Sequence, residues 1–196
     1  MSASGILRST RTSNGLSQRA LAKAARVRQP GVAAVESGSE DATVSRLEHL
    51  LNELGSQLTV LPSRRRPVWA AGEAIRRALD ANDERSAWRE VIQLNDDLRE
   101  ADRATCVALA IAPPGHTGDS RFDALIAAVT DSALVDARLP RPEWLDEDAW
   151  SLNDPWDVEE IPSLRKAARK ATPPAIRRHG IFLDRAVLAS IGCPPP

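Results

Sequence analysis

Two neighbouring polar side chains, Arg28 and Gln29, carry groups that suit the edge of a base pair. The amide of Gln29 can bond adenine N6 and N7 together, and the guanidinium of Arg28 can bond guanine O6 and N7 or bind a phosphate. Both side chains need a rigid element that presents them on one exposed face. The surrounding sequence therefore decides whether this chemistry is available.

The segment LSQRALAKAARVRQPGVAAVESG, residues 16–38, predicts two short helices joined by a tight turn. Ser17 is placed as an N-cap, and Leu21 follows at helical spacing. The second helix is expected from about Gln29 to Glu36, with Gly38 closing it in a left-handed cap. Two short helices across such a turn form a helix-turn-helix, whose second helix enters the DNA major groove.

The segment resembles the Cro and phage-repressor class of helix-turn-helix domains, also called the XRE family. The matching residues are Leu16-Ser17-Gln18, Leu21-Ala22, Val27, Val32 and Val35-Glu36-Ser37-Gly38. The resemblance continues through ATVSRLEHLLNELG to Gly55 and covers about the first third of the chain. It departs at Arg26, where the family usually has glycine. A side chain at positive φ costs about 1–2 kcal/mol, so we expect a slightly strained or re-shaped turn.

The resemblance implies a five-helix, repressor-like domain that binds an inverted repeat of double-stranded DNA as a homodimer. Gln18 matches the glutamine that reaches the DNA backbone and the neighbouring recognition residues. The positions that face the groove are Arg28, Gln29, Pro30 and Ala33. Arg11 and Glu36 resemble a structural pair that ties the first helix to the recognition helix.

Charge is distributed unevenly along the chain. Residues 1–66 hold 10 Lys/Arg and 5 Asp/Glu, a net of +5, whereas residues 67–196 hold 16 and 22, a net of −6. This asymmetry is typical of a DNA-binding head on a body of another kind. The only two cysteines lie far apart in the sequence, which favours the reducing cytoplasm, where the protein would lie at the nucleoid. The sequence shows neither an apolar run long enough to span a bilayer nor a signal peptide, so no association with a membrane is expected. The excess of Arg over Lys, 23 to 3, favours a bacterial source.

The boundary between the two parts is expected at QLTVLPSRRRP. Residues Gln57–Leu61 alternate polar and apolar side chains and predict a short strand that could pair across a dimer. Arg64 and Arg65, in the arginine run between two prolines, could bind phosphates or could be a solvated linker. The resulting division is a DNA-binding domain at 1–61, a linker at 62–67 and a C-terminal domain at 68–196.

Helical periodicity returns after Val68, so the fold class is mainly α, with an α-helical C-terminal domain of one or two parts. The stretch Leu139–Pro162, rich in Pro, Trp and acidic residues, is expected to be irregular. Its large side chains either fill the core or form a partner surface; these are Trp144, Trp150 and Trp156. Asp184 is placed to cap a final short helix that carries Val187, Leu188 and Ile191.

A search for catalytic or metal-binding patterns predicts neither an enzyme nor a cofactor or metal site. His116 and Asp119 share the loop GHTGD, but two residues in a loop are better explained as a solvated turn. His179 could meet a nucleotide or an acidic partner, and is better explained as a helix-end residue. Zinc-peptidase, nucleophile-elbow, P-loop and clustered Cys/His motifs are all missing from the sequence.

The sequence therefore predicts a DNA-binding repressor that controls its own operon. The chain's ending resembles the C-terminal regions of some actinobacterial XRE-type regulators, several of which are encoded beside a nucleotidyltransferase toxin. This resemblance implies an antitoxin whose acidic body masks a basic toxin encoded next to it. The alternative is a ligand-responsive regulator whose helical domain senses a small molecule.

Overall fold

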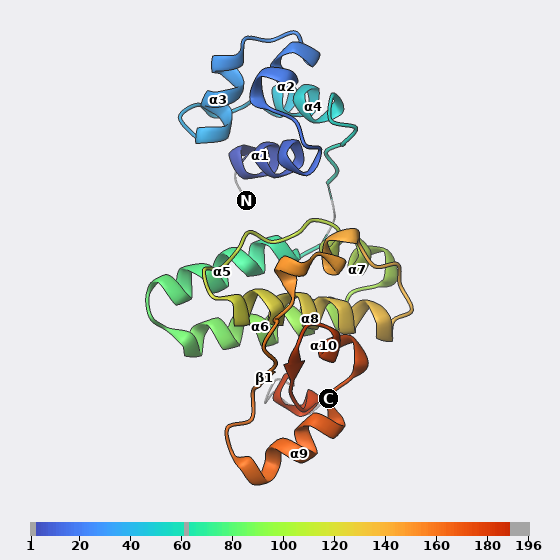
Figure 1. The fold of residues 1–196 in the computed structure, drawn as a ribbon. Coiled ribbons are helices and arrows are strands. Elements are labelled where there is room, and N and C mark those ends of the chain that lie inside the picture. Colours follow the sequence, from blue (N-terminus) through green and yellow to red (C-terminus); the bar gives the residue numbers. More distant parts are fainter. Residues whose placement is uncertain (1–2, 61–62, 189–196) are drawn as a thin grey trace. The chain divides into compact units, whose positions relative to one another are not determined.

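The structure, a computed structural model, describes residues 3–60 and 63–188. It is mainly helical, which confirms the predicted fold class, and it divides into two compact units, Met1–Val60 and Leu61–Pro196 (Figure 1). Each unit has its own hydrophobic core. Within the described ranges, no helix combines the length and the apolar character that a membrane span requires.

The N-terminal unit contains the helices α1 (Ala3–Ser13), α2 (Gln18–Ala24), α3 (Gln29–Ser37) and α4 (Val44–Asn52). The side chains of Ser17 and Thr43 accept hydrogen bonds from backbone N–H groups in the first turns of α2 and α4, so both helices begin at a polar cap. Gly38 ends α3 at a φ of 73°. Apolar side chains of all four helices form the core: Leu7, Leu21, Ala22, Ala25, Val32, Val35, Leu47, Leu50, Leu51 and Leu54.

Residues 3–60 hold four helices, one fewer than the five that the resemblance implies. Gly55, at a φ of 68°, turns the chain after α4, and residues 57–60 belong to no helix and to no sheet. Thr59 and Val60 are β-branched and favour an extended backbone over a fifth helix. The predicted strand is thus not formed within one chain over residues 57–60, because no neighbouring segment pairs with it; Leu61 lies outside the described residues.

The core of the C-terminal unit is built by α5 (Val68–Asp80), α6 (Glu84–Arg99), α7 (Arg103–Ala110) and α8 (Ser120–Asp136). Helix α8 is central, since it packs against α5, α6 and α7 and every residue from Phe122 to Leu134 is buried. Aspartate side chains cap the N-termini of α6, α7 and α8, and these are Asp83, Asp102 and Asp119.

Short elements complete the C-terminal unit. They are η1 (Glu143–Asp146), η2 (Asp148–Trp150), β1 (Trp156–Asp157), α9 (Pro162–Ala171), α10 (Pro174–Arg178), β2 (Ile181–Phe182) and η3 (Arg185–Leu188). Strands β1 and β2 pair in parallel, with Trp156 opposite Ile181. Asp184 caps η3 by accepting from the N–H of Ala186, so the predicted final helix begins as a 3-10 turn. Ile191 lies outside the described residues.

The tryptophans of the irregular stretch belong mainly to the core. Trp144 and Trp150 are buried, and their rings meet edge to face with 5.2 Å between the ring centroids. The indole N–H of Trp144 donates to the carbonyl oxygen of Ala110 at 3.0 Å. Trp156 is half-buried, with its ring 6.0 Å from that of Trp88. Of the two interpretations of these side chains, the structure favours the core.

Candidate nucleic-acid interface

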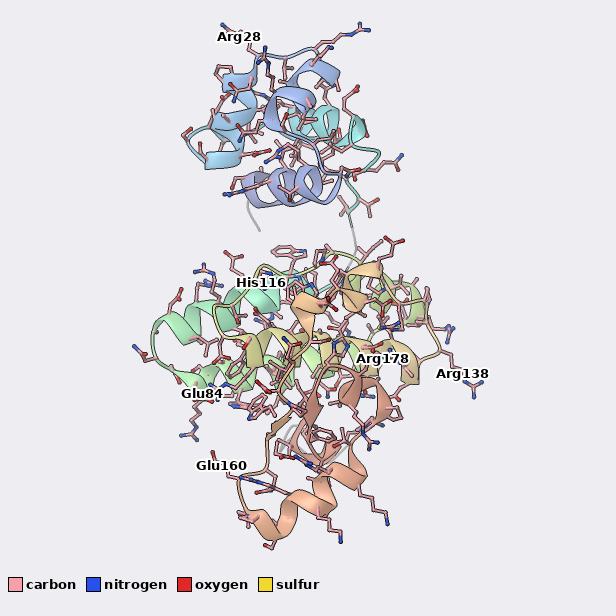
Figure 2. The ribbon with its side chains drawn as sticks, in the orientation of Figure 1. Arg28, Glu84, His116, Arg138, Glu160 and Arg178 are labelled. Carbon is pink, nitrogen blue, oxygen red and sulfur yellow. The ribbon has the colours of Figure 1, made fainter. Side chains whose placement is uncertain are left out.

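The residues expected to face DNA lie at the start of α3. Arg28, Gln29 and Pro30 are exposed, and Ala33 is half-buried one turn further on. The opposite side of α3 is held in the core by Val32, so the exposed residues face solvent. Figure 2 shows the Arg28 side chain at the surface of the N-terminal unit. Pro30 lies in the first helical turn, where a missing N–H costs no helical hydrogen bond.

Glu36, whose side chain is only 3% exposed, joins the first three helices. Arg11 donates from Nε to Oε1 at 2.6 Å and from Nη2 to Oε2 at 2.9 Å, and Gln18 donates from Nε2 to Oε2 at 2.9 Å. Burial by itself raises the pKa of Glu36, but the hydrogen bonds from Arg11 and Gln18 outweigh it and hold that pKa below its ordinary value. The pair therefore remains ionised at neutral pH.

Gln18 connects this buried pair to the exposed recognition residue. Its Oε1 accepts a hydrogen bond from Nε2 of Gln29 at 3.1 Å, while its own amide nitrogen is held by Glu36. The bond uses one of the two amide hydrogens of Gln29 and leaves one donor and one acceptor. These are the two groups that a bidentate contact with adenine requires.

Two side chains of α4 that were not among the predicted site residues brace the neighbouring helices; one of them, His49, was expected to face the surface or a dimer partner. Nε2 of His49 lies 2.9 Å from the carbonyl oxygen of Ala25, at the end of α2. Arg46 pairs with Glu40 and donates from Nη2 to the carbonyl oxygen of Gly31 at 3.3 Å. A Cβ at Gly31 would lie 2.7 Å from that nitrogen, so the absence of a side chain at this position of α3 allows the close approach of Arg46.

The turn between α2 and α3 places Arg26 at a φ of 55°, in the left-handed region. The backbone of this turn therefore has the conformation that glycine usually supplies in the family, with the steric cost of a side chain added. The N–H of Val27 donates to the carbonyl oxygen of Ala22 at 2.9 Å and fixes the turn.

We expect Arg26→Gly to raise the free energy of unfolding of the N-terminal unit by about 0.5–1 kcal/mol. It removes a steric cost of about 1–2 kcal/mol, against an entropic cost of glycine of about 0.5–1 kcal/mol. Urea unfolding followed by far-UV circular dichroism measures the change. Arg19→Gly, which removes the same charge inside α2, is the control and should destabilise the unit by about 1 kcal/mol. Equal losses at both positions would show that Arg26 carries no strain.

Arg64 and Arg65 belong to the C-terminal unit. Arg64 is exposed, whereas Arg65 donates from Nη1 to a carboxylate oxygen of Glu100 at 3.0 Å and from Nη2 to its carbonyl oxygen at 3.1 Å. Neither of the two interpretations drawn from the sequence included this ion pair. Arg65 is thus fastened to the end of α6, whereas Arg64 is exposed.

His116 and Asp119 do not converge on one site. Nδ1 of His116 lies 2.8 Å from a carboxylate oxygen of Asp123, and its ring stacks on Trp150 at 4.8 Å. Asp119 instead caps α8 and pairs with Arg121 at 2.8 Å. Among the described residues, no group of three or more His, Cys, Asp or Glu is arranged to hold a metal ion.

His179 is fully buried at the end of α10 and cannot meet a nucleotide from solvent. Its Nδ1 lies 2.9 Å from the carbonyl oxygen of Trp150, and its Nε2 lies 3.3 Å from Asp131. These contacts give it a structural role inside the C-terminal unit.

Residues 7–61 match the model of a helix-turn-helix family of the XRE type. The match runs from Leu7 in α1 past the end of α4 and therefore contains the whole hydrogen-bonded chain described above. This match supports a DNA-binding regulator of transcription, since the matched family is a regulatory and not a catalytic one. Comparison with curated proteins and with solved structures gave no match.

Proposed function

We propose that this chain is a sequence-specific repressor that regulates its own operon at the bacterial nucleoid. Residues 1–61 would bind DNA, residues 62–67 would act as a linker, and residues 68–196 would bind a toxin as its antitoxin. The observation that carries the DNA-binding part is the chain of hydrogen bonds from the buried Arg11–Glu36 pair through Gln18 to the exposed Gln29. It holds a base-reading amide in a fixed place before DNA arrives.

The proposed complex contains two copies of the chain on an inverted repeat. Their α3 helices would enter successive major grooves about 34–36 Å apart. Gln29, with Arg28, Pro30 and Ala33 beside it, would read bases, while Gln18 and surrounding basic residues would fix the register on phosphates. Arg64 could add a phosphate contact, and Arg65 could do so only after leaving Glu100.

We expect Gln29→Ala to reduce discrimination at one base step of the operator by about 1–3 kcal/mol. Anisotropy of labelled duplexes from the upstream region, each with one base pair changed, measures the preference at a fixed salt concentration. Gln57→Ala removes an exposed amide from the same unit and should leave every preference unchanged. An unaltered preference in Gln29→Ala would exclude Gln29 from the base-reading set.

The antitoxin role is supported by the independence and charge of the second unit. It has a core of its own, and residues 67–196 carry a net charge of −6. An acidic body is complementary to a basic toxin surface, which speeds association and favours the correct partner. A helical body of this kind could alternatively sense a metabolite, so the experiment must separate a protein partner from a small-molecule ligand.

Co-expression with the product of the neighbouring open reading frame tests the proposal. The neighbour is expressed alone and then with the full chain, while growth and co-purification are followed. Toxicity that a stable complex relieves would support the antitoxin role. A harmless neighbour, or toxicity without a complex, would refute that role. A metabolite that then shifts operator affinity would favour the ligand-responsive alternative.

A further inference from the structure

A groove of about 400 Å³ opens beside α9, and we call it the α9 groove. Its apolar lining comes from the segment between β1 and α9, from α9 itself, from the residue after β2 and from η3: Val158, Ile161, Ala168, Leu183 and Val187. Leu183 and Ala168 are buried and close the floor, whereas Ile161 is 54% exposed and Val187 is 42% exposed. The side chains at the mouth therefore keep much of their apolar surface in water.

The apolar surface extends along α9 beyond the groove. Leu164 is 48% exposed and lies on the same face of α9 as Ala168, because residues four positions apart share one side of a helix, and Ile161 is the N-cap residue just before that helix. Single exposed apolar side chains need no explanation, but a cluster beside a hollow marks an interaction surface. Ile161 and Val187, which both line the hollow, form such a cluster.

The rim of the α9 groove is acidic. The polar residues that line it are Glu159, Glu160 and Asp184, and none of its lining residues is basic. Glu160 and Asp184 are exposed, and Glu160 is labelled in Figure 2 just before α9. A segment that fills this groove therefore places its apolar side chains among three carboxylates.

Two of the four basic side chains of α9 are held by groups other than the carboxylates of the rim. The Arg165 guanidinium donates to the carbonyl oxygens of Glu159 and Glu160, and the Glu159 carboxylate accepts a hydrogen bond from the N–H of Ile161 at 2.9 Å. Arg169 binds both carboxylate oxygens of Asp157 at 2.6 Å and lies over the ring of Phe182. Both cations are thus engaged within the unit.

We propose that the α9 groove docks an apolar segment bearing lysine or arginine side chains from the protein that the C-terminal unit binds. The proposal rests on the antitoxin function and specifies its contact surface. Apolar anchors of the partner cover Ile161 and Val187, as an amphipathic helix covers a groove. Flanking cations meet the carboxylates at the rim, where charge pairs govern partner choice and association rate.

Two pairs of exposed-site variants of the full chain test the surface. Ile161→Asp places a charge at the mouth of the groove, and Ile111→Asp makes the same change at a 65% exposed site elsewhere in the unit. Glu160→Lys reverses one charge of the rim, and Glu147→Lys does so at an exposed position outside the groove. Thermal unfolding of all four variants checks that the fold is kept.

Binding is measured with two probes: the purified product of the neighbouring reading frame, and a labelled helical peptide of leucine and lysine. We expect Ile161→Asp and Glu160→Lys each to weaken both interactions about tenfold or more, and their controls to bind as the unaltered chain does. A leucine–glutamate peptide should not bind. Groove variants that bind both probes normally would overturn the proposal.

The remaining outcomes separate the groove from the function. If the neighbour's product fails to bind the unaltered chain, the antitoxin function is refuted. The effect of Ile161→Asp and Glu160→Lys on binding of the leucine–lysine peptide then decides by itself whether the groove selects apolar, basic segments. Light scattering of the free chain tests the other occupant, a second copy. A dimer that Ile161→Asp dissociates and Ile111→Asp preserves would assign the groove to self-association and refute a basic partner.

Discussion

Replacing Glu36 by alanine is expected to lower the free energy of unfolding of the N-terminal unit by about 3–5 kcal/mol, because the Arg11 guanidinium stays buried without its partner. The same change removes the anchor of Gln18 and, through it, the support of Gln29. Operator binding should therefore fall by more than the loss of folded protein accounts for. Glu36→Gln keeps the shape and one acceptor, so its effect should be intermediate.

The five tryptophans make this effect measurable in the intact chain, since all of them lie in the C-terminal unit, at positions 69, 88, 144, 150 and 156. Fluorescence follows that unit alone, whereas far-UV circular dichroism and operator binding also follow the N-terminal unit. Glu48→Ala, at an exposed position of α4, is the control and should change stability by less than about 0.5 kcal/mol. If Glu36→Ala unfolded at the same urea concentration as this control, the buried pair would have no stabilising role.

The local parts of the site could be predicted from the sequence because they depend on residues close together in the chain. Ser17 caps α2, Gly38 ends α3 in the left-handed region, and α3 begins at Gln29 as expected. The left-handed backbone at Arg26 is the strained form of the two that the family's glycine at that position led us to expect. Short-range rules of capping and turn geometry suffice for such features.

Pairings between distant residues could not be predicted in the same way. Arg65 finds Glu100 because α6 ends beside the segment that precedes α5, a fact of packing that no spacing in the sequence conveys. His116 pairs with Asp123 rather than with Asp119, since Asp119 is used to cap α8 and Asp123 lies one turn further along that helix. The α9 groove is equally invisible in the sequence, because it joins segments on both sides of α9.

The largest such long-range feature is the pairing of Asp131, at a fully buried position of α8. Its Oδ1 lies 2.5 Å from Nε of Arg141, and its Oδ2 lies 2.7 Å from Nη1 of Arg178 and 3.3 Å from Nε2 of His179. One carboxylate thus fastens the segment before η1 and the end of α10 to the central helix. Removal of this carboxylate leaves Arg141, Arg178 and His179 without their common partner.

We therefore expect Asp131→Ala to lower the free energy of unfolding of the C-terminal unit by about 3 kcal/mol. The value lies at the low end for a buried pair because Arg178 is partly exposed and Arg141 keeps a second partner in Asp146. Urea unfolding followed by tryptophan fluorescence measures it, with Asp154→Ala at an exposed position as the control. Asp131→Asn, which keeps the shape but not the charge, should lose less.

The pH dependence of the stability difference between the unaltered chain and Asp131→Asn distinguishes a charge effect from a packing effect. Burial by itself raises the pKa of Asp131, but hydrogen bonds from His179 and Arg141 and the charges of Arg141 and Arg178 outweigh it, so that pKa lies below its ordinary value of 3.8. The stabilisation is then complete above the unfolded-state pKa of about 3.9, and it is lost as the pH falls through the lower pKa of the folded protein. The difference between the unaltered chain and Asp131→Asn should hence be constant from neutral pH to about pH 5 and shrink below pH 4. A difference that persisted unchanged into strong acid would mean that the carboxylate acts through its shape and hydrogen bonds, and that its charge contributes nothing to holding α10 on α8.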